Sequence, residues 1–276
     1  MSPNEIERSY IDLLIDLISG KFNRENGLRI NYLLECFDSS SAYDLGCLID
    51  IVGHNQEKFF KIKADLDEEG YYKERIFGFP YSMIGRSRLL NIERLVRRVV
   101  DDDIEGDFVE AGVWRGGACI LARLLLDLLE GPGKRKVVLM DSFEGLPEST
   151  SLHDMQYPFH LDKTLAVGLA QVRQNLCEFG LADRDDIVLW PGYFEKSLRD
   201  YPDHKISILR ADGDLYSSTT AILDNLFDNV SAGGFVVVDD YGALDPCKVA
   251  VDQFLEKRGL YPQLISIDWT GVFFRV

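Results

Sequence analysis

The repeating pattern that begins near residue 106 constrains the fold of this chain most strongly. Short apolar runs alternate there with amphipathic stretches, in units of ~30 residues. The expected strands are Phe108–Glu110, Lys136–Met140, Ile187–Trp190, Ile206–Arg210 and Phe235–Val238. Such alternation predicts an α/β fold, with a mostly parallel sheet covered by helices on both faces.

The two ends of the chain depart from this pattern. Gln263–Ile267 and Val272–Arg275 are joined across a short turn, which predicts an antiparallel hairpin at one edge of the sheet. Near the N-terminus, Ile6–Ile18 has the spacing of an amphipathic helix. Residues 31–72 show no strand alternation, and one charged part, Gln56–Glu69, has a helix-like pattern. We therefore expect residues 1–87 to form a helical or irregular cap and residues 88–276 to form the main domain.

Charge and cysteine content narrow the classes of partner. The formal net charge of −16 argues against nonspecific binding to nucleic acid or to an anionic membrane, because both need a cationic face. No stretch reaches the ~18 apolar residues of a membrane span, and the N-terminus lacks the features of a secretory signal. The five cysteines are scattered and odd in number, which favours reduced thiols and a cytoplasmic location.

A glycine-rich turn follows the first expected strand. The stretch Gly106–Gly117 (GDFVEAGVWRGG) predicts a short buried strand, a glycine turn and the start of a helix, which is how an α/β sheet presents backbone to a nucleoside cofactor. The chain has neither a G-x-G-x-x-G fingerprint nor a Walker lysine. A cofactor whose amino-acid tail approaches the backbone therefore fits better than one with a pyrophosphate, which favours S-adenosylmethionine over NAD. Arg115 and Gly116 in the turn are further candidates for donor contact.

Acidic residues stand at the ends of four expected strands. They are Glu110, Asp141, Asp212 and Asp239, with Asp214 and Asp240 beside them. Because the carboxyl ends of parallel strands meet at one edge, we expect these carboxylates to line the same crevice. Asp141, 31 residues after Glu110, has the position of a carboxylate that accepts the hydroxyls of a ribose. The alternative for each aspartate is a helix cap or a turn.

Three of these aspartates have the composition of a metal site. Asp212, Asp239 and Asp240 offer oxygen ligands without histidine or thiolate, which favours Mg²⁺, or Mn²⁺ or Ca²⁺, over zinc. Three like charges held together destabilise a protein unless a cation is present. A buried carboxylate cluster without metal, with raised pKa values, is the alternative.

Several long motifs in a fixed order resemble one known family. They are Ser82–Gly85 (SMIG), Gly106–Gly117, Asp141–Pro147 (DSFEGLP), Asp212–Thr219 (DGDLYSST) and Gly233–Gly242 (GGFVVVDDYG). In these motifs the chain resembles the macrocin O-methyltransferases, metal-dependent sugar O-methyltransferases of antibiotic biosynthesis that include mycinamicin and novobiocin tailoring enzymes. The resemblance covers roughly residues 76–276. It implies a class I methyltransferase fold, S-adenosylmethionine as donor, Mg²⁺ as cofactor, a glycosylated natural product as substrate and a homo-oligomeric assembly.

The resemblance also implies roles for particular residues. Asp212, Asp239 and Asp240 match the metal ligands, and Asp214 matches the proposed general base, although Asp212 stays open as the base. The residues that match donor-binding motifs and loops are Glu110, Gly112, Asp141, Ser142, Tyr81, Ser82, Met83, Ile84, Gly192, Tyr193 and Phe194. Where the family reads Glu-Thr before Met-Ile-Gly, this chain reads Tyr81-Ser82. The acceptor sugar is therefore not carried over.

Three alternatives differ in function. A methyltransferase of the same fold could use a phenol or catechol, because such enzymes share the carboxylate ligands. A binding protein with a relict site is disfavoured by the intact acidic set. An NAD-dependent oxidoreductase is disfavoured by the missing pyrophosphate loop.

Overall fold

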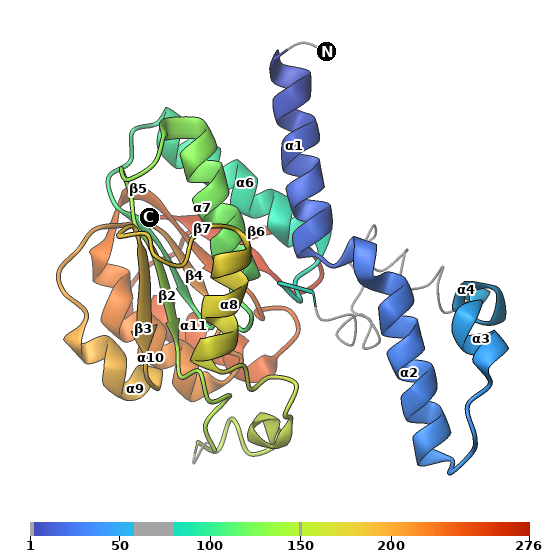
Figure 1. Cartoon of the computed structure of the whole chain (residues 1–276). Helices are drawn as coiled ribbons and strands as arrows, with labels where there is room; N and C mark the ends of the chain where they lie inside the picture. Colours follow the sequence, from blue (N-terminus) through green and yellow to red (C-terminus); the bar gives the residue numbers. More distant parts are fainter. Residues whose placement is uncertain (1–2, 58–79, 149–150) are drawn as a thin grey trace. The chain divides into compact units, whose positions relative to one another are not determined.

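A computed structural model describes residues 3–57, 80–148 and 151–276 of the 276-residue chain (Figure 1). The chain divides into two compact units, Met1–Leu90 and Asn91–Val276. The boundary lies within helix α6 (Arg86–Asp101), and the predicted division after residue 87 falls in the same helix.

The described part of the first unit is helical. Its elements are α1 (Pro3–Ile18), the 3₁₀ helix η1 (Lys21–Asn23), α2 (Arg24–Asp38), α3 (Leu45–Ile49) and α4 (Ile51–His54). Helix α1 confirms the amphipathic helix predicted from Ile6 to Ile18. Part of the segment for which the sequence favoured irregular or helical structure belongs to α2. The helix-like segment Gln56–Glu69 lies almost entirely outside the described residues.

A seven-stranded sheet forms the centre of the second unit. Its strands are β1 (Asp107–Ala111), β2 (Val137–Asp141), β3 (Ile187–Pro191), β4 (Ile206–Ala211), β5 (Val230–Val238), β6 (Ile265–Ser266) and β7 (Val272–Arg275). The strand order is β3-β2-β1-β4-β5-β7-β6. The first five strands are parallel, whereas β7 runs antiparallel to both β5 and β6. The predicted α/β class, the mostly parallel sheet and the C-terminal hairpin are confirmed.

Helices follow the parallel strands in the predicted alternation. They are α7 (Gly117–Glu130), η3 (Phe159–Leu161), α8 (Leu169–Glu178), α9 (Phe194–Ser197), η4 (Leu198–Asp200), α10 (Tyr216–Leu226), η5 (Phe227–Asn229) and α11 (Asp245–Arg258). Helices α10 and α11 pack together against one face of the sheet, while α7 contacts β1 and β2 (Figure 1). Among the helices that the structure describes, none combines the length and the hydropathy needed to cross a membrane.

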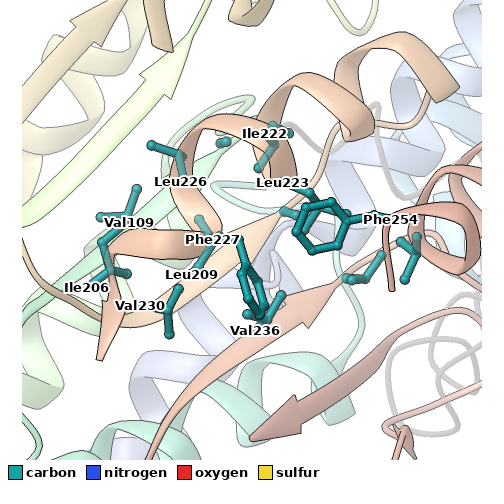
Figure 2. Close-up of a cluster of buried hydrophobic side chains, with 14 of the residues drawn as sticks. Val109, Ile206, Leu209, Ile222, Leu223, Leu226, Phe227, Val230, Val236 and Phe254 are labelled. Atoms are coloured by element: carbon teal, nitrogen blue, oxygen red, sulfur yellow. The ribbon is translucent and has the colours of Figure 1, made fainter. Parts of the chain in front are cut away.

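The main apolar core lies between the sheet and the α10–α11 pair (Figure 2). Alternate strand residues point to this face, as Val109, Leu209 and Val236 do, because side chains in a strand point to opposite faces in turn. The rings of Phe227 and Phe254 pack edge to face there, with centroids 5.1 Å apart. Residues of β1, β2, β4, β5 and β7 all contribute to this core, which joins the sheet to α10 and α11.

The boundary between α10 and β5 differs from the sequence prediction. The expected strand begins at Phe235, but β5 begins at Val230, directly after η5. Val230 is buried in the core and pairs with Ile206, so tertiary contacts recruit it to the sheet. A register shift between β4 and β5 accommodates the glycines that separate Val230 from Phe235.

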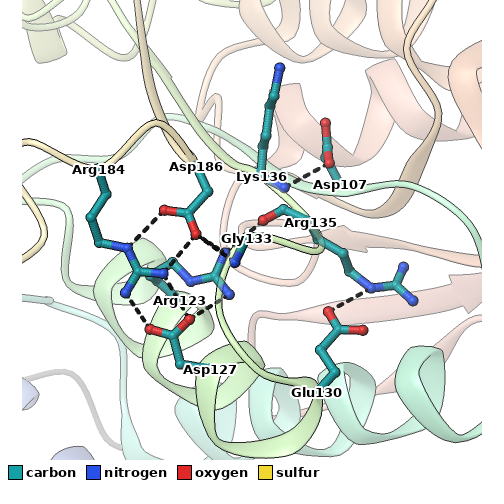
Figure 3. Close-up of polar contacts among 9 residues, drawn as sticks. All are labelled: Asp107, Arg123, Asp127, Glu130, Gly133, Arg135, Lys136, Arg184 and Asp186. Carbon is teal, nitrogen blue, oxygen red and sulfur yellow. Dashed lines mark hydrogen bonds and ion pairs between the residues drawn. The ribbon is translucent and has the colours of Figure 1, made fainter.

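An ion-pair network holds the amino-terminal edge of β2 and β3 (Figure 3). Arg184 pairs with Asp127 of α7 at 2.5 Å and with Asp186 at 2.6 Å. The fully buried Arg123 pairs with Asp127 at 2.8 Å, and the Gly133 N–H donates to Asp186 at 3.0 Å. The network ties α7, the loop after it and the loop before β3 together, at the edge opposite the acidic motifs.

Candidate functional site

Three loops leave the carboxyl edge of the sheet in register. The Gly112 N–H donates to the Met140 carbonyl at 2.8 Å, and the Asp212 N–H donates to the Ala111 carbonyl at 2.8 Å. The Asp239 N–H continues the pattern to Ala211 at 3.0 Å. Strand order reverses between β1 and β4, which is where doubly wound sheets bind ligands. The glycine turn and the acidic motif DGD therefore meet at the expected crevice.

Gly112 allows this close approach. Its φ is +96°, and a Cβ at this position would lie 1.8 Å from the Asp212 carbonyl oxygen. Any side chain would push the turn after β1 away from the loop after β4. Gly112, which we predicted to bind the donor, therefore also sets the distance between the turn after β1 and the loop after β4.

Asp141 anchors the glycine turn. One of its carboxylate oxygens accepts the Val113 N–H at 2.8 Å, and the other accepts the Phe143 N–H at 2.8 Å. Burial raises the pKa of Asp141, while these backbone N–H groups oppose the rise. Ser142 next to it donates to the Gly145 carbonyl at 2.7 Å. Both residues lie at the crevice, and their predicted contacts with a donor remain predictions.

A buried asparagine, to which the sequence analysis assigned no role, supports the same turn. Asn175 of α8 is 1% exposed and donates its amide to the Arg115 carbonyl at 2.8 Å, while Gln171 donates to its oxygen at 2.9 Å. Gly116 in the turn has φ +84°, and the space beside it is bounded by Val172 of α8. An asparagine on the apolar side of an amphipathic helix was the available signal.

Arg210 is the second residue that the sequence analysis missed. It is 2% exposed, and its guanidinium forms ion pairs with Glu110, Asp212 and Asp239. Burial lowers the pKa of Arg210, but Asp239, Asp212 and Glu110 hold it well above its usual range. Strand register explains the cluster, because Glu110 pairs with Arg210 across β1 and β4, and Asp212 is two residues further on the same face. A lone arginine at the end of an apolar strand was the signal.

Glu110 lies inside β1, where the sequence predicted the end of the strand. It is 1% exposed, and Cys119 of α7 donates its thiol to the carboxylate at 2.8 Å. Burial raises the pKa of Glu110 to about 7, against the lowering effects of Arg210 and Cys119. The side chain therefore helps position Arg210, and its predicted role in donor binding remains a prediction.

Asp212, Asp214 and Asp240 form the group of carboxylates that lie close enough to share a cation. One oxygen from each lies within 4.8 Å of the others. Two of the three belong to the set predicted from sequence, while Asp239 instead forms an ion pair with Arg210. Asp214 has φ +55°, and its pKa is raised well above the usual range by burial and then by Asp212, Asp239 and Asp141.

The loop after β3 adds another wall. Gly192 donates its N–H to the Asp141 carbonyl at 2.8 Å, and the Tyr193 hydroxyl lies 3.4 Å from Glu144. Phe194 begins α9 and packs against the main core. A cleft of about 420 Å³ opens here, lined by Pro147, Glu148, Ser151, Tyr193, Glu195, Lys196 and Ser217.

The remaining predicted donor contacts belong to the first unit. Ser82 and Ile84 are buried within the described structure, and the Tyr81 and Ser82 N–H groups both donate to the Ile18 carbonyl. The proposed contact of residues 81–84, including Met83, with a donor remains a prediction.

The N-terminus of α10 is capped by a residue from another loop. The N-cap residue of the helix, Leu215, makes no side-chain capping hydrogen bond. Asp154 accepts the N–H groups of Tyr216 at 2.7 Å and of Ser217 at 3.2 Å. The cap is 62 residues away in the chain, so no local pattern marked it.

Comparisons with known proteins agree with this arrangement. The model of the macrocin O-methyltransferase family matches residues 8–276. A tetracenomycin-C 4'-O-methyltransferase from Streptomyces olivaceus is 42% identical over 199 residues, which cover 71% of this chain and 75% of the relative. A demethyldecarbamoylnovobiocin O-methyltransferase from Streptomyces niveus is 41% identical over 199 residues, with 71% and 75% covered.

A solved structure extends the likeness to the whole fold. The O-methyltransferase NovP superposes with a TM-score of 0.78 at 32% identity, covering 97% of this chain and 98% of that one. The family model covers residues 8–276, and two relatives are 42% and 41% identical over 71% of this chain. The chain therefore belongs to the macrocin O-methyltransferase family, and it is an O-methyltransferase of the class I fold.

Proposed function

We propose that this protein transfers a methyl group from S-adenosylmethionine to a sugar hydroxyl of a glycosylated natural product. The observation that carries the proposal is the meeting of the Gly112 turn with the loop Asp212–Asp214 at one crevice. The names of the relatives support the substrate class. One relative methylates a rhamnosyl-tetracenomycin at the 4' position, and another, 35% identical, is a mycinamicin III 3''-O-methyltransferase from Micromonospora griseorubida.

The donor would lie along the turn after β1. The turn lies this close to the loop after β4 because Gly112 carries no side chain. Asp141 stands at the end of β2, where a ribose would lie in this fold. Tyr193 in the next loop would cover the base from the side of β3.

A divalent cation would fit beside the donor. Oxygen-only ligands from Asp212 and Asp240, with Asp239 as the third ligand predicted from sequence and Asp214 as the alternative, suit Mg²⁺ better than a thiophilic metal. Arg210 alone does not balance the charge of the surrounding carboxylates, which also include Glu110 and Asp239. When bound, such a cation would lower the pKa of a coordinated hydroxyl and so help to form the nucleophile.

Asp214 is the proposed base for the sugar hydroxyl. Proton removal by a positioned carboxylate typically contributes a factor of ~10² to 10⁴. A carboxylate oxygen of Asp214 lies within 4.8 Å of oxygens of Asp212 and Asp240, so the base would lie beside the residues that would hold the cation. Donor and acceptor held on one edge of the sheet gain the further advantage of proximity.

Methyl transfer to a panel of acceptors tests the proposal. The purified protein is incubated with S-adenosylmethionine and Mg²⁺, and with either deoxysugar glycosides or catechols, and the products are identified by mass spectrometry. We expect methylated glycosides. Methylation of catechols alone would assign the protein to the phenol-type reaction.

The cation site is tested by single substitutions. Asp212→Asn and Asp240→Asn are expected to weaken Mn²⁺ binding, measured by titration calorimetry, while the affinity for S-adenosylhomocysteine stays unchanged. Asp214→Asn and Asp239→Asn then identify the third ligand. If Asp239 serves, as predicted from sequence, its variant loses Mn²⁺ affinity. If Asp214 serves, the loss occurs in Asp214→Asn.

We also propose that the protein forms a homo-oligomer and is located in the cytoplasm. Helix α1 buries Ile11 and Ile15 on one side, yet exposes a second apolar stripe that includes Ile6 and Leu13, which are 57% and 55% exposed. Exposed apolar stripes of this kind are typical of subunit contacts. The five cysteines are free thiols in the structure, which suits a reducing compartment.

A further inference from the structure

We propose that Asp154 is a positioning residue for methyl transfer, because it fastens the loop before α8 (residues 151–168) to the first turn of α10 and thereby holds the acidic loop before that helix. The expected effect on turnover rests on the proposed function, whereas the contact between Asp154 and α10 does not depend on it.

The contact is built from one buried carboxylate and three donors. Asp154 is 3% exposed. One of its oxygens accepts the Tyr216 N–H at 2.7 Å, and the other accepts the Ser217 N–H at 3.2 Å and the Ser217 hydroxyl at 2.9 Å. The first N–H groups of a helix have no partner within it, and a negative charge there is favourable. Asp154 thus completes the start of α10 from outside the helix.

The first turn of α10 directly follows the loop that carries Asp212 and Asp214. Asp214 is two residues before Tyr216, and the Leu215 N–H donates back to the Gly213 carbonyl at 2.5 Å. Gly213 itself packs so closely on the helix that a Cβ would lie 3.1 Å from the Thr219 nitrogen. A displacement of the first turn would therefore move the loop that carries Asp212 and Asp214.

The other end of the contact reaches the cleft. The Asp154 N–H donates to the Ser151 carbonyl at 3.1 Å, and Ser151 lines the cleft opposite Ser217. The His153 ring packs on Tyr216 with centroids 4.4 Å apart. Asp154 thus holds two walls of the cleft together, and its loss should disturb the acceptor side of the site while the Gly112 turn is left in place.

Limited proteolysis tests the contact without any assumption about catalysis. Lys163 is an exposed residue of the same loop, and cleavage after it by trypsin reports how often the loop opens. Loss of a helix cap changes such an equilibrium by about tenfold, so Asp154→Ala should be cut at Lys163 about ten times faster. The control is Asp107→Ala, which removes a carboxylate that accepts the Lys136 N–H at 2.8 Å at the opposite edge of the sheet. Equal cleavage rates in Asp154→Ala and the wild type would overturn the inference.

Steady-state kinetics test the positioning role. A displaced catalytic group typically lowers turnover by about 10²-fold. We expect Asp154→Ala to lose kcat to that extent, with unchanged affinity for S-adenosylhomocysteine by calorimetry. Asp154→Asn retains acceptor capacity at one oxygen and should recover part of the lost turnover. Ser217→Ala, a milder change, should have a smaller effect alone and no additional effect in the Asp154→Ala background.

The two readouts separate the possible failures. If the proteolysis result holds but the wild type methylates no acceptor, the proposed function fails and the contact stands. If the wild type is active and Asp154→Ala keeps its kcat, the positioning role is wrong. Turnover that falls equally in Asp107→Ala would also contradict it, because that outcome indicates general destabilisation.

Discussion

Gly112 shows how one residue can determine two neighbouring loops. A Gly112→Ala variant would need a left-handed conformation and a place for a Cβ that lies 1.8 Å from the Asp212 carbonyl. Backbone strain of this kind costs about 1 to 3 kcal/mol. We expect lower stability in urea and at least tenfold weaker binding of S-adenosylhomocysteine by calorimetry, since tenfold is about 1.4 kcal/mol. Gly168→Ala is the control, because Gly168 has φ −70° and open space around it.

Among the charged side chains, Arg210 is expected to contribute strongly to the stability of the fold. The Arg210→Met variant would remove the guanidinium that forms ion pairs with Glu110, Asp212 and Asp239. Removing one partner of a buried pair typically costs about 3 to 5 kcal/mol. Urea unfolding should show a loss of this size. The exposed Arg199→Met is the control, and a loss equally small in both variants would mean that the carboxylates compensate without Arg210.

At the scale of elements, the network at the amino edge of β2 and β3 predicts a pH dependence. A hydrogen bond from Arg184 lowers the pKa of Asp186, against the effect of burial. A carboxylate with a lowered pKa stabilises the fold above its unfolded pKa of ~3.9, and that contribution is lost as the pH falls through the folded value. Asp186→Asn should therefore cost about 1 to 3 kcal/mol at neutral pH.

Unfolding in urea at several pH values measures this difference. The gap between the wild type and Asp186→Asn should be constant above pH ~5 and narrow below pH ~4, as the aspartate of the wild type becomes protonated. Asp203→Asn, at an exposed position, serves as control. A gap that widens on acidification would contradict the assigned sign.

For the whole molecule, the exposed stripe of α1 predicts assembly. Leu13 is 55% exposed beside Ile6, Tyr10 and Leu17 on one face of the helix. If this stripe forms the contact between two copies, Leu13→Glu should shift the protein to the monomer in sedimentation equilibrium. Tyr261→Glu, at a position 87% exposed in the second unit, should leave the mass unchanged. A wild-type protein that is monomeric in sedimentation equilibrium would contradict the proposed homo-oligomer.

Features that depend on local pattern could be predicted from the sequence alone. Apolar runs such as Ile206–Arg210 and Phe235–Val238 placed the strands, because a buried parallel strand must be apolar on both faces. The glycines near Gly112 predicted a turn. Two short runs joined by a turn, Gln263–Ile267 and Val272–Arg275, predicted the C-terminal hairpin. Family membership also followed from motifs, since these motifs record local structure and chemistry together.

Which side chains come into contact depends on the packing of segments that are distant in the chain. Glu110 and Arg210 are 100 residues apart, and only the register of β1 and β4 makes them neighbours. That register directs Asp239 to Arg210 and leaves Asp214 with Asp212 and Asp240. Asp154 caps α10 across 62 residues for the same reason. Contacts of this kind depend on how distant segments pack, and packing leaves no periodic signal in the chain.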